Sequence, residues 1–291
     1  MNLLYMAFGP NAQIHLQTSF SIYSFLTPQQ GISTVNIITD NDYFYNHFGN
    51  RVNIIKITSE ELKSWEGAYH FFWRIKIKAI EKVCSLYKGQ PVLYLDCDTF
   101  LYGDLATMQS ALQRGVGLMH ENEGPLSLKK NKTQKRMWQE IKGKSFAGIS
   151  IQTGGEMWNS GVVGLPNNKG GKDCEQLLAL CDEMCSAGVT RYFIEQYALS
   201  VGLKEIYGLE EAKPAVIHYW SVKSWWDKEI TGFFLRAYFE CWGYEQILAE
   251  MKLFDLTAIP YFQKVKNTNL RLKYLIDKIF PHEDIRYLPG N

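Results

Sequence analysis

The chain has 291 residues, with 31 Lys plus Arg against 30 Asp plus Glu, so its formal net charge at pH 7 is +1. Without a basic excess, nucleic acid is not an expected partner. A chain of this length can bury a large core, and α/β folds of this size often form one domain. We therefore expect one main domain with a helical tail.

The cysteines and the apolar runs give information on the cellular location of the protein. None of the six cysteines forms a paired Cys-x-x-Cys spacing, which favours reduced cytosolic thiols over a zinc site or a disulfide framework. Residues 1–9 lack a basic segment and are too short for a signal peptide or a membrane anchor. No apolar run approaches the thickness of a bilayer. The sequence predicts a cytoplasmic protein that is at most peripheral to a membrane.

The first third of the chain alternates between strand-like and helical patterns. Apolar runs at 3–8, 34–39, 52–57 and 92–95 predict strands, and the patterns at 14–26 and 71–87 predict helices. Such alternation is typical of βα units on a parallel sheet with helices on both faces. After the first strand, Gly9-Pro10-Asn11 has turn composition, which indicates either an ordinary βα turn or a nucleotide contact.

The strand at 92–95 ends in two carboxylates, Asp96 and Asp98. Its uninterrupted apolar run suits a strand buried on both faces, and ligands collect at the carboxyl edge of such sheets. Two carboxylates this close repel each other unless a cation lies between them. Hard oxygen ligands select Mg²⁺ or Mn²⁺, which often bridge a protein carboxylate to phosphates. The alternative is that both residues are helix caps or turn residues.

The remainder of the chain is less regular. Between 121 and 157 the apolar periodicity weakens, which predicts a surface insertion, either near a substrate site or simply solvated. Beyond residue 225 the pattern is helical through 230–251. The tail at 262–287 mixes basic with apolar residues, as in helices that lie on an anionic membrane or that pack on their own domain. We expect a main domain at 1–226 and a helical extension at 227–291 packed on it.

Four segments, in order, resemble those of nucleotide-sugar-dependent glycosyltransferases of the GT-A fold, most closely the retaining family-eight galactosyl- and glucosyltransferases. The first is the carboxylate strand at 92–105, and the second is the Asn-Ser-Gly-Val strand at 158–165. The third is Glu195-Gln196, and the fourth is His218 followed by Lys223. Here Glu195 replaces the family's Asp. The spacing from His218 to Lys223 is one position shorter than in the family, and Ser221 stands where the family has Gly.

The resemblance implies a mixed sheet flanked by helices and a role for each matching residue. Asp96, Asp98 and His218 would hold Mn²⁺ or Mg²⁺, and Lys223 would contact the diphosphate. By the same resemblance, four residues would bind the donor or lie beside its reacting carbon: Arg74, Asn159, Glu195 and Gln196. From their places after predicted strands, Phe8, Gly9 and Glu121 are also expected to contact the donor. For Arg74 the alternative is a solvated helix face on which Lys78 pairs with Glu81. For Glu195 and Gln196 the alternative is an exposed helix start.

The function implied is transfer of a hexose from a nucleotide diphosphate sugar, expected to be a UDP-sugar, to a glycan, glycolipid or other hydroxyl acceptor, with retention of configuration. Three alternatives stay open. One is a nucleotidyltransferase, although the chain lacks an early Gly-rich segment for a triphosphate. Another is an inverting enzyme with Glu195 or Asp227 as its base. The last is a carbohydrate-binding relative that has lost turnover.

Overall fold

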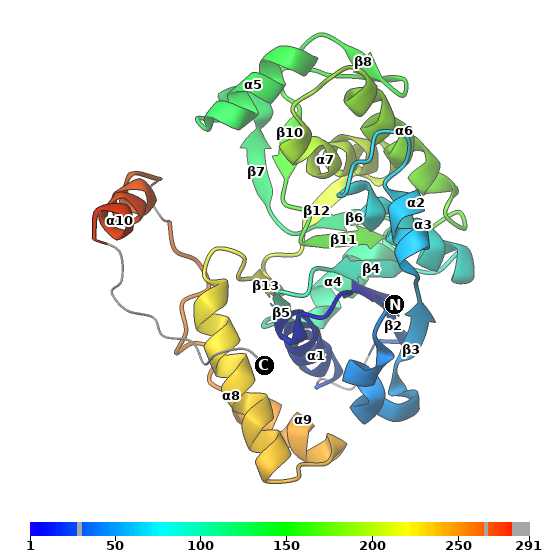
Figure 1. Cartoon of the computed structure of the whole chain (residues 1–291). Coiled ribbons are helices and arrows are strands. Elements are labelled where there is room, and N and C mark those ends of the chain that lie inside the picture. Colours follow the sequence, from blue (N-terminus) through cyan, green and yellow to red (C-terminus); the bar gives the residue numbers. More distant parts are fainter. Residues whose placement is uncertain (28–30, 265–266, 281–291) are drawn as a thin grey trace.

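The computed structural model describes residues 1–27, 31–264 and 267–280. Its centre is a seven-stranded sheet (Figure 1) in the order β12 (Leu209–Glu211), β6 (Gly117–Met119), β11 (Val162–Leu165), β4 (Val92–Leu95), β1 (Asn2–Met6), β2 (Thr34–Thr39) and β3 (Asn53–Lys56). All neighbouring strands run parallel except that β11 is antiparallel to β4 and β6. The expected mixed α/β sheet flanked by helices is confirmed.

Each face of the sheet carries its own apolar core. Leu4 and Tyr94 pack with α3 (Arg74–Leu86), α6 (Lys172–Ser186) and α7 (Ile194–Tyr207) on one face. Leu93 and Leu95 pack with α1 (Ala12–Leu26) and α4 (Leu105–Gln113) on the other. Neighbouring residues of one strand point to opposite faces, so β4 is apolar at every position because both faces are covered.

Three short strand pairs lie beside the main sheet. β5 (Thr99–Leu101) pairs with β13 (Val216–His218), β7 (Asn122–Pro125) with β10 (Glu156–Trp158), and β8 (Ser145–Phe146) with β9 (Ile149–Ser150). The remaining elements before residue 223 are η1 (Asp42–Arg51), α2 (Ser59–Trp65), η2 (Leu126–Leu128), α5 (Lys132–Ile141) and η3 (Arg191–Phe193).

The segment 121–157 is more structured than the sequence predicts. It forms β7, η2, α5, β8, β9 and β10, and Met137, Ile141 and Met157 are fully buried in the core around α7. Its weak periodicity has a physical reason. Short two- to four-residue strands give too few positions for a repeat to show.

The C-terminal helices pack against α1. The predicted helical stretch at 230–251 is two helices, α8 (Lys223–Phe239) and α9 (Tyr244–Leu253), separated by a turn in which Cys241 has φ 53°. Both α8 and α9 contact α1, and they lie next to it in Figure 1. The predicted domain boundary at residue 226 therefore falls inside α8. α10 (Asn267–Ile279) follows, and the predicted tail at 262–287 lies partly outside the described residues. Among the described residues, no helix has both the length and the apolarity needed to cross a membrane.

Trp226 joins these helices to the main domain. Its side chain is fully buried, its ring lies 4.6 Å from that of Phe100 and 5.1 Å from that of Tyr219, and its Nε1–H donates to the Pro260 carbonyl at 3.1 Å. The neighbouring Trp225 is half exposed.

We predict that Trp226→Ala lowers the free energy of unfolding by about 3–5 kcal/mol, because it leaves a cavity and an unpaired carbonyl. Trp225→Ala is the matched control and should change it by less than about 1 kcal/mol. Urea unfolding followed by circular dichroism measures both. Equal losses in the two variants would contradict the account of how α8 is held.

Candidate functional site

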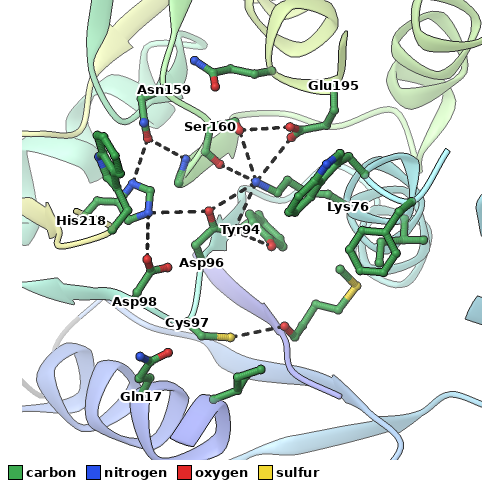
Figure 2. Close-up of a pocket in the computed structure, with 18 of the residues that line it drawn as sticks. Gln17, Lys76, Tyr94, Asp96, Cys97, Asp98, Asn159, Ser160, Glu195 and His218 are labelled. Atoms are coloured by element: carbon green, nitrogen blue, oxygen red, sulfur yellow. Dashed lines mark hydrogen bonds and ion pairs between the residues drawn. The ribbon is translucent and has the colours of Figure 1, made fainter. Parts of the chain in front are cut away.

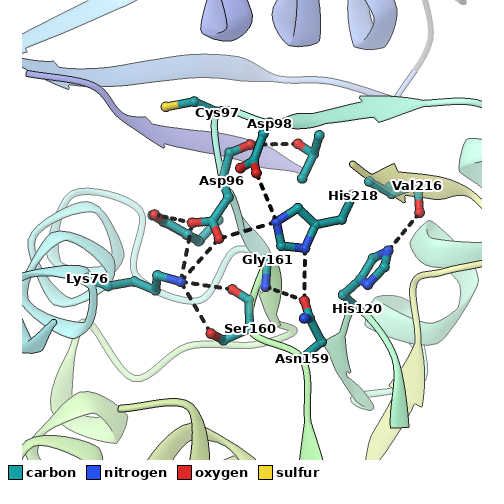
Figure 3. A network of polar contacts seen from close by, with 12 residues as sticks. Lys76, Asp96, Cys97, Asp98, His120, Asn159, Ser160, Gly161, Val216 and His218 are labelled. Atoms are coloured by element: carbon teal, nitrogen blue, oxygen red, sulfur yellow. Dashed lines mark hydrogen bonds and ion pairs between the residues drawn. The ribbon is translucent and has the colours of Figure 1, made fainter. Parts of the chain in front are cut away.

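Asp96, Asp98 and His218 converge at the carboxyl end of β4. Each offers one ligand atom, and these three atoms lie within 4.8 Å of one another. Strand pairing brings them together, because His218 on β13 stands opposite Thr99 on β5 and the Tyr219 N–H donates to the Asp98 carbonyl at 3.1 Å. Figure 3 shows both carboxylates facing the imidazole. Two carboxylates and one imidazole form a donor set that fits Mn²⁺ or Mg²⁺.

Asn159 fixes the orientation of the His218 ring. Its Oδ1 accepts the Gly161 N–H at 3.0 Å and also lies 3.0 Å from His218 Nδ1. An amide oxygen only accepts, so Nδ1 carries a proton, and Nε2 is the ring nitrogen left to serve as a metal ligand. Nε2 is the atom that faces the carboxylates, 3.4 Å from Asp98 and 3.9 Å from Asp96. The ring is therefore oriented as a metal ligand.

Gly161 provides the space that His218 occupies. A Cβ at this position would lie 2.2 Å from Nδ1 and 2.4 Å from Cε1 of the ring, which is far below any normal contact. The backbone is fixed at the same point, because the Asp96 N–H donates to the Gly161 carbonyl at 2.8 Å. The Asn-Ser-Gly sequence thus brings an acceptor for the ring and room for it to the same place.

Lys223 lies beside Asp98 at the start of α8, with 2.8 Å between Nζ and Oδ2. Burial disfavours the charged form of Asp98, but His218 and Lys223 outweigh it and hold the pKa of the carboxyl well below its usual range. Burial also opposes the charge on Lys223, yet Asp98 raises the pKa of this amine. Cys97, between the two aspartates, points away toward the Met6 carbonyl, and burial raises the pKa of its thiol to about 12.

Lys76 on α3 belongs to the candidate site, although the sequence analysis did not single it out. Its Nζ lies 3.2 Å from Asp96, 3.4 Å from Glu195 and 3.1 Å from the Ser160 carbonyl (Figure 2), and its side chain is 8% exposed. Burial works against its charge, but Asp96 and Glu195 raise the pKa of Lys76 to about 12. Glu195 shows the opposite balance, because burial outweighs Lys76 and raises the pKa of its carboxyl. A signal was present: Lys76 interrupts the apolar stripe of Phe72, Ala79 and Val83.

Two adjoining cavities meet at these residues. The first, of about 500 Å³, brings together most of the predicted site residues: Phe8, Asp96, Asp98, Asn159, Glu195, Gln196, His218 and Lys223. The second is larger, about 1080 Å³, and reaches the C-terminal segment through Tyr261 and Phe262. Both cavities are lined by Asn159, Tyr192, Phe193, Gln196, His218 and Trp220.

Three of the predicted site residues do not line the first cavity. Arg74 points away from the first cavity, because its guanidinium makes a two-bond contact with Asp182 at 2.8 and 3.0 Å. The Gly9 N–H donates to Asp40 at 2.9 Å, so it serves the turn after β1. Glu121 pairs with Lys213 and lines the second cavity only.

Two of the alternatives raised by the sequence can be compared with the structure. The Lys78–Glu81 ion pair, expected as the alternative on the Arg74 face of α3, is present. Asp227, the other candidate base, accepts a hydrogen bond from the Gln17 amide and is not among the residues that line either cavity.

No protein-family model matches the sequence, and no curated protein matches it. Solved structures do show similarity. The galactosyltransferase LgtC, in complex with donor and acceptor sugar analogs, is 15% identical over 73% of this chain and 73% of its own, with a TM-score of 0.48. Mouse xyloside xylosyltransferase 1 in its apo form is 14% identical over 84% of this chain and 96% of its own, also at 0.48. The glycosyltransferase GlyE of Streptococcus pneumoniae is 14% identical over 91% of this chain and 56% of its own, at 0.43.

We predict that Gly161→Ala weakens Mn²⁺ binding about tenfold or more, because the new methyl group displaces the His218 ring while leaving all three ligand residues in place. Gly154→Ala is the control, since a Cβ there meets nothing within 4 Å. Isothermal titration calorimetry measures both affinities. If the two variants bind Mn²⁺ equally well, the ring is not held as described.

We predict that Lys76→Met lowers the free energy of unfolding by about 3–5 kcal/mol at pH 7, because Asp96 and Glu195 are left without their shared cation. The folded pKa is raised, so the stabilisation by the ammonium is fully present below its unfolded pKa of about 10.4 and is lost only as the pH rises through the folded value.

Lys78→Met, on the same helix, is the control for Lys76→Met. It breaks a partly exposed pair and should cost below about 1 kcal/mol. Denaturant unfolding at pH 7 compares the two variants, and a similar cost for both would show that the buried triad is not a special source of stability.

Proposed function

We propose that the protein is a metal-dependent hexosyltransferase of the GT-A fold, most like the retaining family-eight enzymes. It would move a hexose from a nucleotide diphosphate sugar, expected to be a UDP-sugar, to a hydroxyl group of a glycan, lipid or other acceptor. The observation that carries the proposal is the Asp96, Asp98 and His218 cluster with Lys223 beside it, in the same cavity as Glu195 and Gln196.

One group of these residues suits the leaving group. As the glycosidic bond breaks, the diphosphate gains negative charge. Lys223 Nζ would neutralise part of it as a point charge, after turning from Asp98 to the phosphate. When bound by Asp96, Asp98 and His218, Mn²⁺ or Mg²⁺ would supply Lewis-acid stabilisation of the same charge.

A second group of residues suits the sugar. Gln196 offers a neutral amide whose carbonyl dipole can stabilise an oxocarbenium-like centre. Glu195 and Lys76 form a buried ion pair that can hold sugar hydroxyls in a fixed orientation. Asn159, which already orients His218, lines both cavities, so its amide would lie close to the transferred sugar.

Retention of configuration is favoured over inversion by the positions and contacts of the two candidate bases. Glu195 is held by Lys76 and by the Ser160 hydroxyl at 3.3 Å, and Asp227 faces Gln17. Glu195 lines only the first cavity and Asp227 lines neither, so neither carboxylate faces an acceptor bound in the second cavity. In a retaining reaction the departing phosphate oxygen can accept that proton on the same face. The nucleotidyltransferase alternative is disfavoured by the apolar Phe8 and the engaged Gly9 N–H after β1, since a triphosphate needs donors there.

The second cavity is our proposed acceptor site. It adjoins the first through shared residues, and its walls include the half-exposed or exposed rings of Tyr192, Trp220, Tyr261 and Phe262. Aromatic faces of this kind pack on the apolar faces of sugar rings. Polar groups such as the Glu121–Lys213 ion pair add hydrogen-bonding partners. A glycan or glycolipid headgroup fits this combination.

The remaining expectations stay as proposals. We propose that 1–226 is the catalytic domain, that 227–291 is a helical extension packed on it, and that the protein is cytoplasmic. Contact with a membrane surface through the tail is supported by α10, on which Leu272, Leu275, Ile276 and Ile279 are exposed beside Lys278.

We predict that, with Mn²⁺, the protein releases nucleotide diphosphate from at least one of a panel of nucleotide sugars by slow donor hydrolysis. Asp98→Asn should lower kcat/KM about 100-fold or more, and Lys223→Ala should lower kcat while Mn²⁺ remains bound. Glu210→Gln is the control, because Glu210 pairs with Arg114 on the exposed surface. Activity that survives in Asp98→Asn, or no release from any donor, would reject the proposed function.

The anomeric configuration of the product, read from its proton coupling in NMR spectra, completes this test. An α-linked donor should give an α-linked product. A β-linked product would overturn the retaining assignment and return attention to Glu195.

A further inference from the structure

The carboxylate of Glu123 sets the orientation of the Gln196 side-chain amide. The proposed reaction has no other use for this carboxylate. Gln196 lies in the first turn of α7, and its Nε2 is 3.3 Å from Oε1 of Glu123 on β7. A carboxylate only accepts hydrogen bonds, so the NH₂ group must face Glu123. The carbonyl oxygen Oε1 of Gln196 is therefore turned the other way.

Glu123 is itself held in place. Lys129 Nζ lies 3.2 Å from Glu123 Oε2 and also donates to the Glu123 backbone carbonyl. The side chains of Lys129 and Glu123 are 18% and 27% exposed, so both have limited freedom to rotate. The two oxygens of the Glu123 carboxylate therefore have separate partners, one in Lys129 and one in Gln196.

The orientation of the Gln196 amide can be described relative to the two cavities. Gln196 lines both cavities, whereas Glu123 and Lys129 line only the second. Gln196 thus bonds through its NH₂ group to a residue of the second cavity, which leaves its carbonyl oxygen available to a group bound in the first cavity beside Asp96, Asp98 and Lys223.

We propose that Glu123 is a positioning residue that keeps the Gln196 carbonyl oxygen directed at the reacting carbon of the donor sugar. The inference rests on the proposed function. A carbonyl oxygen stabilises positive charge on that carbon, whereas a rotated amide would present N–H groups of the wrong sign. Without Glu123 the amide is free to rotate by half a turn, and the population with the useful orientation falls.

Three variants separate positioning from other roles. Glu123→Ala removes the acceptor. Glu123→Gln keeps a carbonyl oxygen that can still accept the hydrogen bond, so it should restore part of the loss. Lys129→Met removes the ion pair and leaves the Gln196 hydrogen bond, so its effect on kcat should be smaller than that of Glu123→Ala.

Two readouts are needed. The first is the side-chain amide resonances of Gln196 in ¹H–¹⁵N NMR spectra, identified by their absence in Gln196→Leu, and these should shift in Glu123→Ala. The second is steady-state kinetics with the Mn²⁺-loaded protein and an active nucleotide sugar. Glu123→Ala should lower kcat about 10- to 100-fold, by the same factor for donor hydrolysis and for transfer, with the donor KM unchanged.

Loss of transfer with normal donor hydrolysis would overturn the proposal, because it would place Glu123 on the acceptor. Unmoved Gln196 resonances in Glu123→Ala would overturn it whatever the activity. A wild-type protein that hydrolyses no donor would instead reject the proposed function.

Discussion

The balance of buried charge at the carboxyl end of β4 is the constraint on which the rest of the site depends. Asp96, Asp98 and Glu195 are carboxylates largely removed from water, and each faces a cation or an imidazole from a different part of the chain. Lys76 comes from α3, and Lys223 from the start of α8. A buried charge without its partner is costly, so these long-range pairs fix how α3 and α8 dock on the sheet. The same pairs hold the carboxylates in a geometry that suits a divalent cation.

The two cavities follow from this arrangement. Asn159 and His218 stand between them, connected by a hydrogen bond and made possible by the absence of a side chain at Gly161. One cavity contains the charged residues that suit a diphosphate, and the other contains aromatic rings that suit a sugar. A donor and an acceptor bound on the two sides would meet at the shared wall. Proximity of that kind is a large part of what an enzyme contributes to group transfer.

Local patterns in the sequence predicted much of the fold and part of the site. The apolar run 92–95 and the two aspartates after it predicted β4 and the position of a possible metal site at its end, because burial on both faces leaves a clear signature. Long-range features were not predictable in the same way. Lys76 interrupts the apolar stripe of its helix, but its two carboxylate partners are distant in the chain and cannot be read from that pattern. Arg74, two residues earlier, appeared the better candidate, yet its partner Asp182 lies on α6. The turn at Cys241 and the short strands between 121 and 157 left no periodic signal.

The proposed function requires that Asp96, Asp98 and His218 hold a divalent cation that binds a nucleotide diphosphate. Isothermal titration calorimetry of UDP into the protein, with Mn²⁺ and then with EDTA, tests it most directly. We expect UDP to bind with Mn²⁺ present and its affinity to fall at least about tenfold when the metal is removed, because the cation would bridge the carboxylates to the phosphates. UDP binding of equal affinity with and without the metal would contradict it.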